Sequence, residues 1–155
     1  MYQPLMGACF GVTSQTVYWG FKDYTNTFGH KVQRAEDQMI APANGKLRNL
    51  HAYTYGGIQA GTSMYLTVLI NGITTSLVTQ VTGIGGVSSY AFSNLSDVIS
   101  VNSGDTFGLK VDCSGRVTTN PSSIVYVFPS IVYESENFMI SNIDIASTTT
   151  TNHIF

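Results

Sequence analysis

Charged side chains are scarce in this sequence. Seven Lys or Arg and nine Asp or Glu make up 10% of its 155 residues, well below the roughly 25% typical of soluble domains. The cationic residues are scattered, so the chain has no basic patch that would track a nucleic-acid backbone, and we expect no nucleic-acid partner. The polar surface must consist of Ser, Thr, Asn, Gln and Gly. Because few charges keep copies apart, we expect part of this surface to be buried against other subunits.

Cysteines are also scarce. Cys9 and Cys113 are the two cysteines of the chain, and two residues so far apart make no disulfide framework. They lack CxxC spacing and clustered histidines, so we expect no zinc site. Whether they pair is left open. Cys113 continues an inward alternation that begins at Phe107, and this pattern favours a buried free thiol.

No segment has the features of a membrane span or an export signal. No apolar run approaches the about 20 residues that cross a bilayer, so we expect no membrane partner. Residues 1–12 lack the basic region and the long apolar region of a signal peptide. A surface rich in Ser and Thr is common on extracellular and virion β-proteins. Together these features predict a virion location, or a chain from which a leader has been removed.

Alternating apolar and polar residues run through residues 61–128 and predict a series of β-hairpins. Residues 63–70 alternate clearly. Asn71-Gly72 then provides the strongest short-range hairpin signal, because both central residues of a type I′ turn need positive φ. Residues 74–82 are the predicted return strand.

Glycines and turn residues divide the rest of this stretch. The glycines among residues 83–86 predict a bend between sheets, and no Lys-Ser or helix follows that would make them a phosphate-binding loop. Residues 98–101 predict a strand and residues 102–105 a tight turn. The next strand, residues 107–113, places alternate side chains toward the core.

The remaining strands are read from composition. Residues 15–21 and 38–41 have β composition, and residues 124–128 alternate again. Pro129 cannot donate a backbone hydrogen bond, so we expect it at a sheet edge or at the end of that strand.

Residues 46–55 are predicted to form a strand with two different faces. One face carries the alternate residues from Leu50 to Thr54. The other carries a row of His and Tyr, which is a candidate interface: His51, Tyr53 and Tyr55. Such a row suits either a sugar or protein contact surface or a packed interface inside an oligomer. We favour the oligomer interface, because few charges are present to keep this face solvated.

Three more residues are candidate interface anchors. Trp19 is the single tryptophan, and we expect it in the core or in an interface, with a ligand-stacking platform as the alternative. Ile154 and Phe155 end a polar tail, where they either dock into a neighbouring copy or remain disordered.

The pattern of short strands without a confident helix predicts an all-β fold, an antiparallel β-sandwich or jelly roll of about eight strands. Residues 1–40 would form an N-terminal arm or first strands, residues 41–134 the jelly-roll core, and residues 135–155 a C-terminal extension.

Nothing in the sequence marks an enzyme. His51 lacks a marked nucleophile and orienting acid, and the adjacent carboxylates Glu36 and Asp37 are read as a solvated loop. We expect no catalytic residues, no cofactor and no metal. Asn94-Leu95-Ser96 matches a glycosylation sequon, but a three-residue match is a weak signal.

Three motifs in residues 40–128 resemble a pattern of bacteriophage and other viral structural proteins. The segments are IAPANGKLRNL, GTSMYLTVLINGITTSL and VNSGDTFGLKV, followed by the apolar strand SSIVYVF. Modules of this kind are similar to the tumour-necrosis-factor/C1q-type jelly roll, which is usually trimeric. They occur as capsid decoration or cement proteins, head fibres and tail-fibre tips.

The resemblance implies assembly and carries over no catalytic residue. It implies a homotrimer that binds the major capsid protein and stabilises the shell. The alternative is a receptor-binding fibre tip whose loops, residues 83–89 and 114–123, contact host glycans. An enzyme or a free carbohydrate-binding module is a third hypothesis, disfavoured because no paired carboxylates or nucleophile elbow are present.

Overall fold

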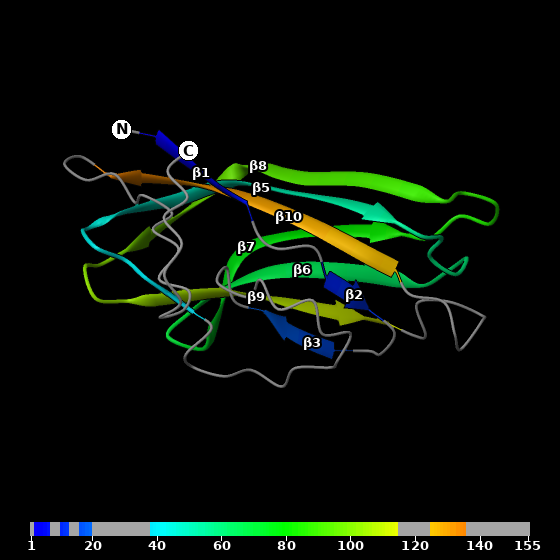
Figure 1. The fold of residues 1–155 in the computed structure, drawn as a ribbon, viewed down its shortest axis with the longest axis horizontal. Helices are drawn as coiled ribbons and strands as arrows, with labels where there is room; N and C mark the ends of the chain where they lie inside the picture. Colours follow the sequence, from blue (N-terminus) through cyan, green and yellow to red (C-terminus); the bar gives the residue numbers. More distant parts are fainter. Residues whose placement is uncertain (1, 7–9, 13–15, 20–37, 115–124, 136–155) are drawn as a thin grey trace, which may run out of the picture.

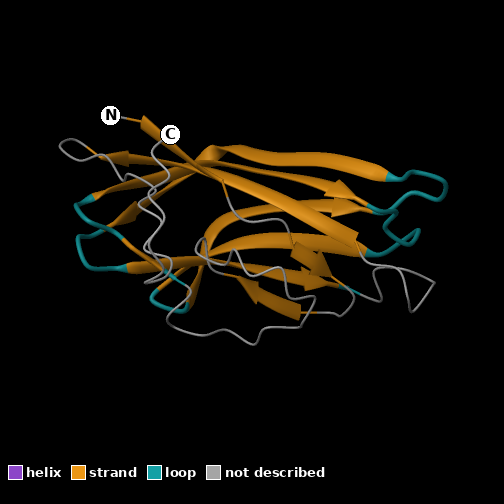
Figure 2. Ribbon diagram, in the orientation of Figure 1, coloured by secondary structure: helices purple, strands orange, loops and turns teal. Residues whose placement is uncertain are grey.

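The computed structural model describes residues 2–6, 10–12, 16–19, 38–114 and 125–135. In this part of the chain the structure is an all-β sandwich of two antiparallel sheets, one above the other in the view of Figure 1. Strands and their connecting turns account for all of it, as Figure 2 shows. Among the described residues, no helix is long and apolar enough to cross a membrane.

Each sheet contains four strands in a row and one short strand beside them. The first sheet has the order β1-β10-β5-β8, with β2 also paired to β10. Its strands are β1 (Tyr2–Met6), β2 (Phe10–Val12), β5 (Gly45–Tyr55), β8 (Ser89–Val101) and β10 (Val125–Ser135). The second sheet has the order β3-β9-β6-β7, with β4 also paired to β9. Its strands are β3 (Thr16–Trp19), β4 (Met39–Ile40), β6 (Ser63–Ile70), β7 (Ile73–Thr82) and β9 (Thr106–Cys113).

The chain passes between the two sheets repeatedly, and this produces the jelly-roll order. Strands β5 and β6 follow one another in sequence but lie in different sheets, as do β7 and β8 and then β9 and β10. The loop after β7 carries Gly86 at φ 82°, which confirms the predicted glycine bend between sheets. The β6–β7 hairpin is also confirmed, because Asn71 and Gly72 have φ of 51° and 78°.

The core lies between the sheets and is built from alternate residues of the long strands. Its large, fully buried side chains are Leu5, Leu47, Leu50, Met64, Leu66, Leu77, Phe107, Leu109, Ile131 and Tyr133. Phe107 of β9 and Tyr133 of β10 stack across the two sheets, with their ring centroids 6.2 Å apart. The Tyr133 hydroxyl donates a 2.6 Å hydrogen bond to the carbonyl of Ala43. This side chain therefore joins both sheets to the loop before β5.

Replacing Tyr133 by Phe is expected to lower the free energy of unfolding by about 1 kcal/mol, because the ring stays in place and the hydroxyl's hydrogen bonds with the Ala43 carbonyl and the Ser135 side chain are lost. Urea unfolding of the two proteins measures the difference. Tyr65→Phe is the matched control, because the Tyr65 hydroxyl makes no hydrogen bond to the described residues. An equal loss in both variants would contradict a specific role for the bond to Ala43.

The prediction that Pro129 marks a strand end or a sheet edge is wrong. Pro129 lies inside β10, which has β5 on one side and β1 and β2 on the other. On that second side the pairing with β2 stops at Val127 and the pairing with β1 resumes at Ser130. On the side of β5, Pro129 lies opposite Ala52 within a continuous part of the pairing.

Strand β8 is longer than predicted, because it starts at Ser89 rather than near Val98. In its pairing with β5, Arg48 is opposite Val98 and Leu50 is opposite Asn94. Three residues of β8, including Leu95, therefore stand opposite the single residue Asn49, which has φ of 53°. This β-bulge carries the Asn, Ser and Asp residues that resemble a loop in sequence.

Candidate interaction surface

The outer face of the first sheet carries the predicted row of His and Tyr. Along β5, Leu50, Ala52 and Thr54 are buried against the core. The residues between them, His51, Tyr53 and Tyr55, are exposed on the opposite face. The predicted division of this strand into two faces is therefore confirmed.

Strand β10 adds two aromatic side chains to the same face. Its register places Phe128 opposite Tyr53 and Tyr126 opposite Tyr55. The rings of Tyr53 and Phe128 are in contact, with centroids 6.1 Å apart and planes at 46°. Phe128 is 42% exposed and Tyr55 63% exposed. We call these four residues the aromatic patch: Tyr53, Tyr55, Tyr126 and Phe128.

The two halves of this face differ in charge. Opposite Tyr53 and Tyr55, β8 presents Ala91 and Ser89, so the aromatic half is neutral. At the other end the Nε of Arg48 lies 3.4 Å from Oε2 of Glu134. A partner that covers the aromatic patch would remove apolar rings from water without desolvating a charge of this chain.

The other predicted interface residues lie elsewhere. Trp19 ends β3 in the second sheet, opposite Leu109, and its side chain is outside the described structure. Ile154 and Phe155 also lie outside the described residues, as do Cys9, Glu36 and Asp37. The structure brings His51, Tyr53 and Tyr55 together and does not bring Trp19 to them.

Phe128 and Tyr126 are interface candidates that the sequence reasoning missed. The signal was present, since they alternate with the buried residues Val125 and Val127. Aromatic residues that alternate with buried valines indicate a second apolar face. What the sequence could not show is that β10 pairs directly with β5 and places these rings beside Tyr53.

Two titratable groups outside the aromatic patch, Asp105 in a turn and Cys113 in the core, contribute to the fold. Among these residues no group of three His, Cys, Asp or Glu could hold a metal ion. The Asp105 carboxylate accepts hydrogen bonds from the side chain of Asn71 and the backbone of Asn102, at 2.8 Å each. These bonds, that of Asn71 first, hold the Asp105 pKa below its ordinary value. They tie the β6–β7 turn to the β8–β9 turn.

Cys113 is buried and has a free thiol, as predicted. Burial, and secondarily the negative charge of Asp112, raises the pKa of this thiol from 9.0 to about 11. The folded state therefore favours the protonated form of the Cys113 thiol. Its contribution to stability is complete below the unfolded pKa and is lost as the pH rises through the folded pKa.

We expect the free energy of unfolding to fall more steeply between pH 9.0 and about 11 in the native protein than in Cys113→Ala. The comparison isolates the thiol from the Tyr and Lys residues that titrate in the same range. Urea unfolding at the two ends of this range measures it. Parallel pH profiles for the two proteins would show that the thiol does not contribute.

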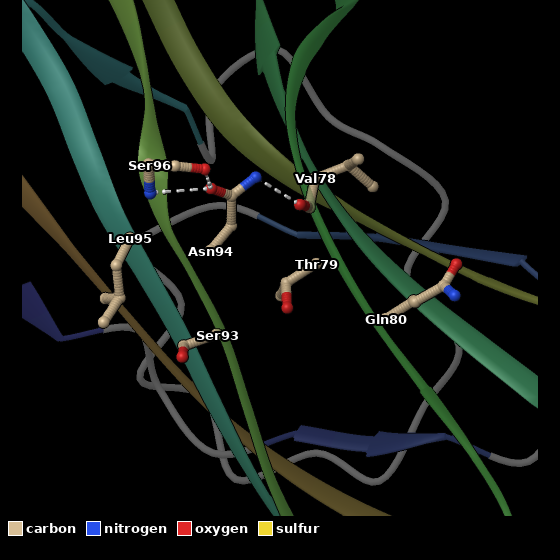
Figure 3. A pocket seen from close by; sticks show the side chains of 7 residues that line it. All are labelled: Val78, Thr79, Gln80, Ser93, Asn94, Leu95 and Ser96. Carbon is tan, nitrogen blue, oxygen red and sulfur yellow. Dashed lines mark hydrogen bonds between the residues drawn. The ribbon is translucent and has the colours of Figure 1, made fainter.

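A second surface feature is a shallow groove between the adjacent edges of the two sheets (Figure 3). It has a volume of about 500 Å³ and is lined by Val78, Thr79, Gln80, Ser93, Asn94, Leu95 and Ser96. The Asn94 amide nitrogen donates to the Val78 carbonyl at 2.8 Å and to the Asp97 carboxylate at 2.7 Å. Both N–H groups of the sequon asparagine are thus used inside the fold, and the bond to Val78 joins β8 to β7.

No protein-family model matches the sequence, and a search of curated proteins finds no match. The function is therefore argued from the surface and from the sequence motifs.

Proposed function

We propose that this protein is a virion structural protein that assembles as a homotrimer through the aromatic patch and decorates a capsid. The observation that carries the proposal is the neutral cluster of exposed rings on the outer face of the first sheet, above all Tyr55, Phe128 and Tyr53. Large contiguous apolar patches on a soluble chain mark interaction sites.

The chemistry of the patch suits association with protein. Tyrosine combines a large apolar ring with a hydroxyl, and it loses little conformational entropy when it is buried in an interface. The neighbours of Tyr53 and Tyr55 on β8 are small, so a flat partner surface could approach the rings closely. In a ring of three copies each patch would contact a different surface of the next copy, because only twofold contacts pair a surface with itself.

The capsid part of the proposal rests on the sequence motifs of residues 40–128 and on the low charge of the chain. A decoration protein stabilises a shell by burying surface against the major capsid protein and its own copies. It needs no catalytic group and no cofactor. A rigid sandwich with a neutral apolar face meets these requirements.

A receptor-binding fibre tip is the second candidate, and the loops at one end of the sandwich favour it. The loops 56–62 and 83–88 carry no charged residue. Gly83 donates to the Thr62 carbonyl at 2.8 Å, and the Tyr90 hydroxyl bonds both the N–H and the C=O of Ile84. These bonds hold Ile84 rigidly although it is exposed, and a preorganised loop loses less entropy on binding.

Virus particles that lack this protein separate the two functions. For a decoration protein we expect particles with shells that break more readily on heating, that still adsorb to host cells, and that regain stability when the purified protein is added back. Intact shells that fail to adsorb would instead support the fibre tip. Particles unchanged in both respects would contradict a virion role.

A further inference from the structure

Among the described residues, strands β7 and β8 are the open edges of their sheets, and they lie next to each other without pairing. β7 is the last strand of the order β3-β9-β6-β7, and β8 is the last strand of the order β1-β10-β5-β8. The groove of Figure 3 lies between them. An edge strand presents every second residue's N–H and C=O away from its sheet.

The hydrogen bonds of the following loop show which β7 residues face away. Gly83 bonds toward β6, since its N–H donates to the Thr62 carbonyl and its C=O accepts from Gly61. Alternation then places the backbone groups of Val78, Gln80 and Thr82 on the open side. The Val78 carbonyl confirms this direction, because it accepts from the Asn94 side chain of β8.

The same reasoning applies to β8. The carbonyl of Ser88, the residue before β8, accepts a hydrogen bond from the Gly56 N–H. The Tyr90 N–H donates to the Thr54 hydroxyl of β5. The backbone groups of residues two apart point to the same side of a strand. Ser88 and Tyr90 point toward β5, so Ser93, three residues after Tyr90, presents its N–H and C=O to the open side. The groove therefore lies between two rows of outward-facing backbone groups.

The exposed edge of β7 lacks the usual protection. Its sequence, ITTSLVTQVT, contains no charge and no proline, the two devices that most often prevent strand addition. The Asn94 side chain occupies the Val78 carbonyl, and the alternation set by Gly83 places the N–H and C=O of Gln80 on the side away from β6. Beside it, Leu95 is 60% exposed and Ser93 is exposed.

We propose that the free edge of β7, residues 78–82, binds an extended and uncharged segment of a partner protein by strand addition. The backbone groups of Gln80 and Thr82 would form the ladder. The uncharged groove lining favours Ser, Thr and small apolar side chains, because a charged side chain would lose water there without gaining a counter-ion. Asn94 marks the end of the available edge, since it already occupies the Val78 carbonyl.

Amide hydrogen exchange of the full chain tests the proposal directly. The probe is a peptide with the sequence TSTVTS, which does not occur in this chain, with both ends blocked so that it carries no charge. We expect the Gln80 N–H to exchange freely in the protein alone and about tenfold more slowly when nine-tenths of the protein is bound. The control peptide TSKVKS, with two lysines in place of threonines, should give no slowing.

Two variants distinguish backbone recognition from side-chain recognition. Gln80→Pro removes the outward N–H while leaving the pairing with β6, so it should abolish binding. Gln80→Ala keeps the N–H and should bind as the native protein does. Because proline could disturb the fold, the exchange of the β6 amides is measured in the same experiment, and the native protein with its two peptides remains a test without any variant.

Three results would overturn the proposal. The first is a Gln80 N–H already protected in the protein alone, which would mean that the edge is covered within the chain. The second is equal slowing by the charged and uncharged peptides. The third is self-association of the native protein that Gln80→Pro removes, which would make a second copy the occupant of this edge.

Discussion

Replacing Tyr55 or Phe128 by Asp is expected to convert the assembled protein into monomers. Both side chains belong to the aromatic patch, and Tyr55 is its most exposed member. A carboxylate at either position would be buried without a partner in the interface, and truncation at the centre of an interface typically costs about 2 kcal/mol or more. This corresponds to an association constant lowered about 30-fold at each contact. Sedimentation velocity over a range of concentrations measures the shift.

The matched control is Ile73→Asp. Ile73 is 71% exposed, more than Tyr55, but it lies on β7 in the second sheet. The same change of an exposed apolar residue to a carboxylate should leave assembly unchanged there. If Ile73→Asp dissociates the protein as strongly as Tyr55→Asp, the aromatic patch has no special role and general loss of surface apolarity explains the result.

The largest effect on stability is expected from Phe107→Ala. Phe107 is fully buried on β9 and stacks on Tyr133 of β10. Removing its ring leaves a cavity between the sheets and deprives Tyr133 of its partner, so the free energy of unfolding should fall by about 3–5 kcal/mol. Unfolding in urea, followed by circular dichroism, measures the loss.

Phe107→Leu serves as the control for volume and polarity. It keeps most of the buried apolar surface and should cost less than half as much as Phe107→Ala. If Phe107→Ala costs under about 1 kcal/mol, the two sheets are not held together at this point and the packing described between β9 and β10 is wrong.

Alternation and turn chemistry were sufficient to predict most of the strands. The β6–β7 hairpin was predicted from Asn71 and Gly72, and both have the positive φ that a type I′ turn needs. The two faces of β5 followed from a period of two residues, because Leu50 and Thr54 are buried and Tyr53 and Tyr55 are not. These features depend on neighbouring residues, so the sequence contains the necessary information.

Features that depend on pairing could not be predicted in this way. Pro129 lies inside β10 opposite Ala52 of β5, and the residues around Pro129 do not show which strands pair with β10. At the β8 bulge, Asn94 donates to the Val78 carbonyl of the other sheet, a contact that the neighbouring residues in the sequence do not show. Phe128 could not be assigned to the aromatic patch from the sequence either, because its contact with Tyr53 depends on the pairing of β10 with β5.

Sedimentation equilibrium of the native protein tests the central claim most directly. The claim is that the outer face of the first sheet, with Tyr53, Tyr55 and Phe128 at its centre, is an assembly interface. The expected result is a species with three times the chain mass of 16.8 kDa. A protein that remains a monomer of that mass at micromolar concentration and above would contradict the account.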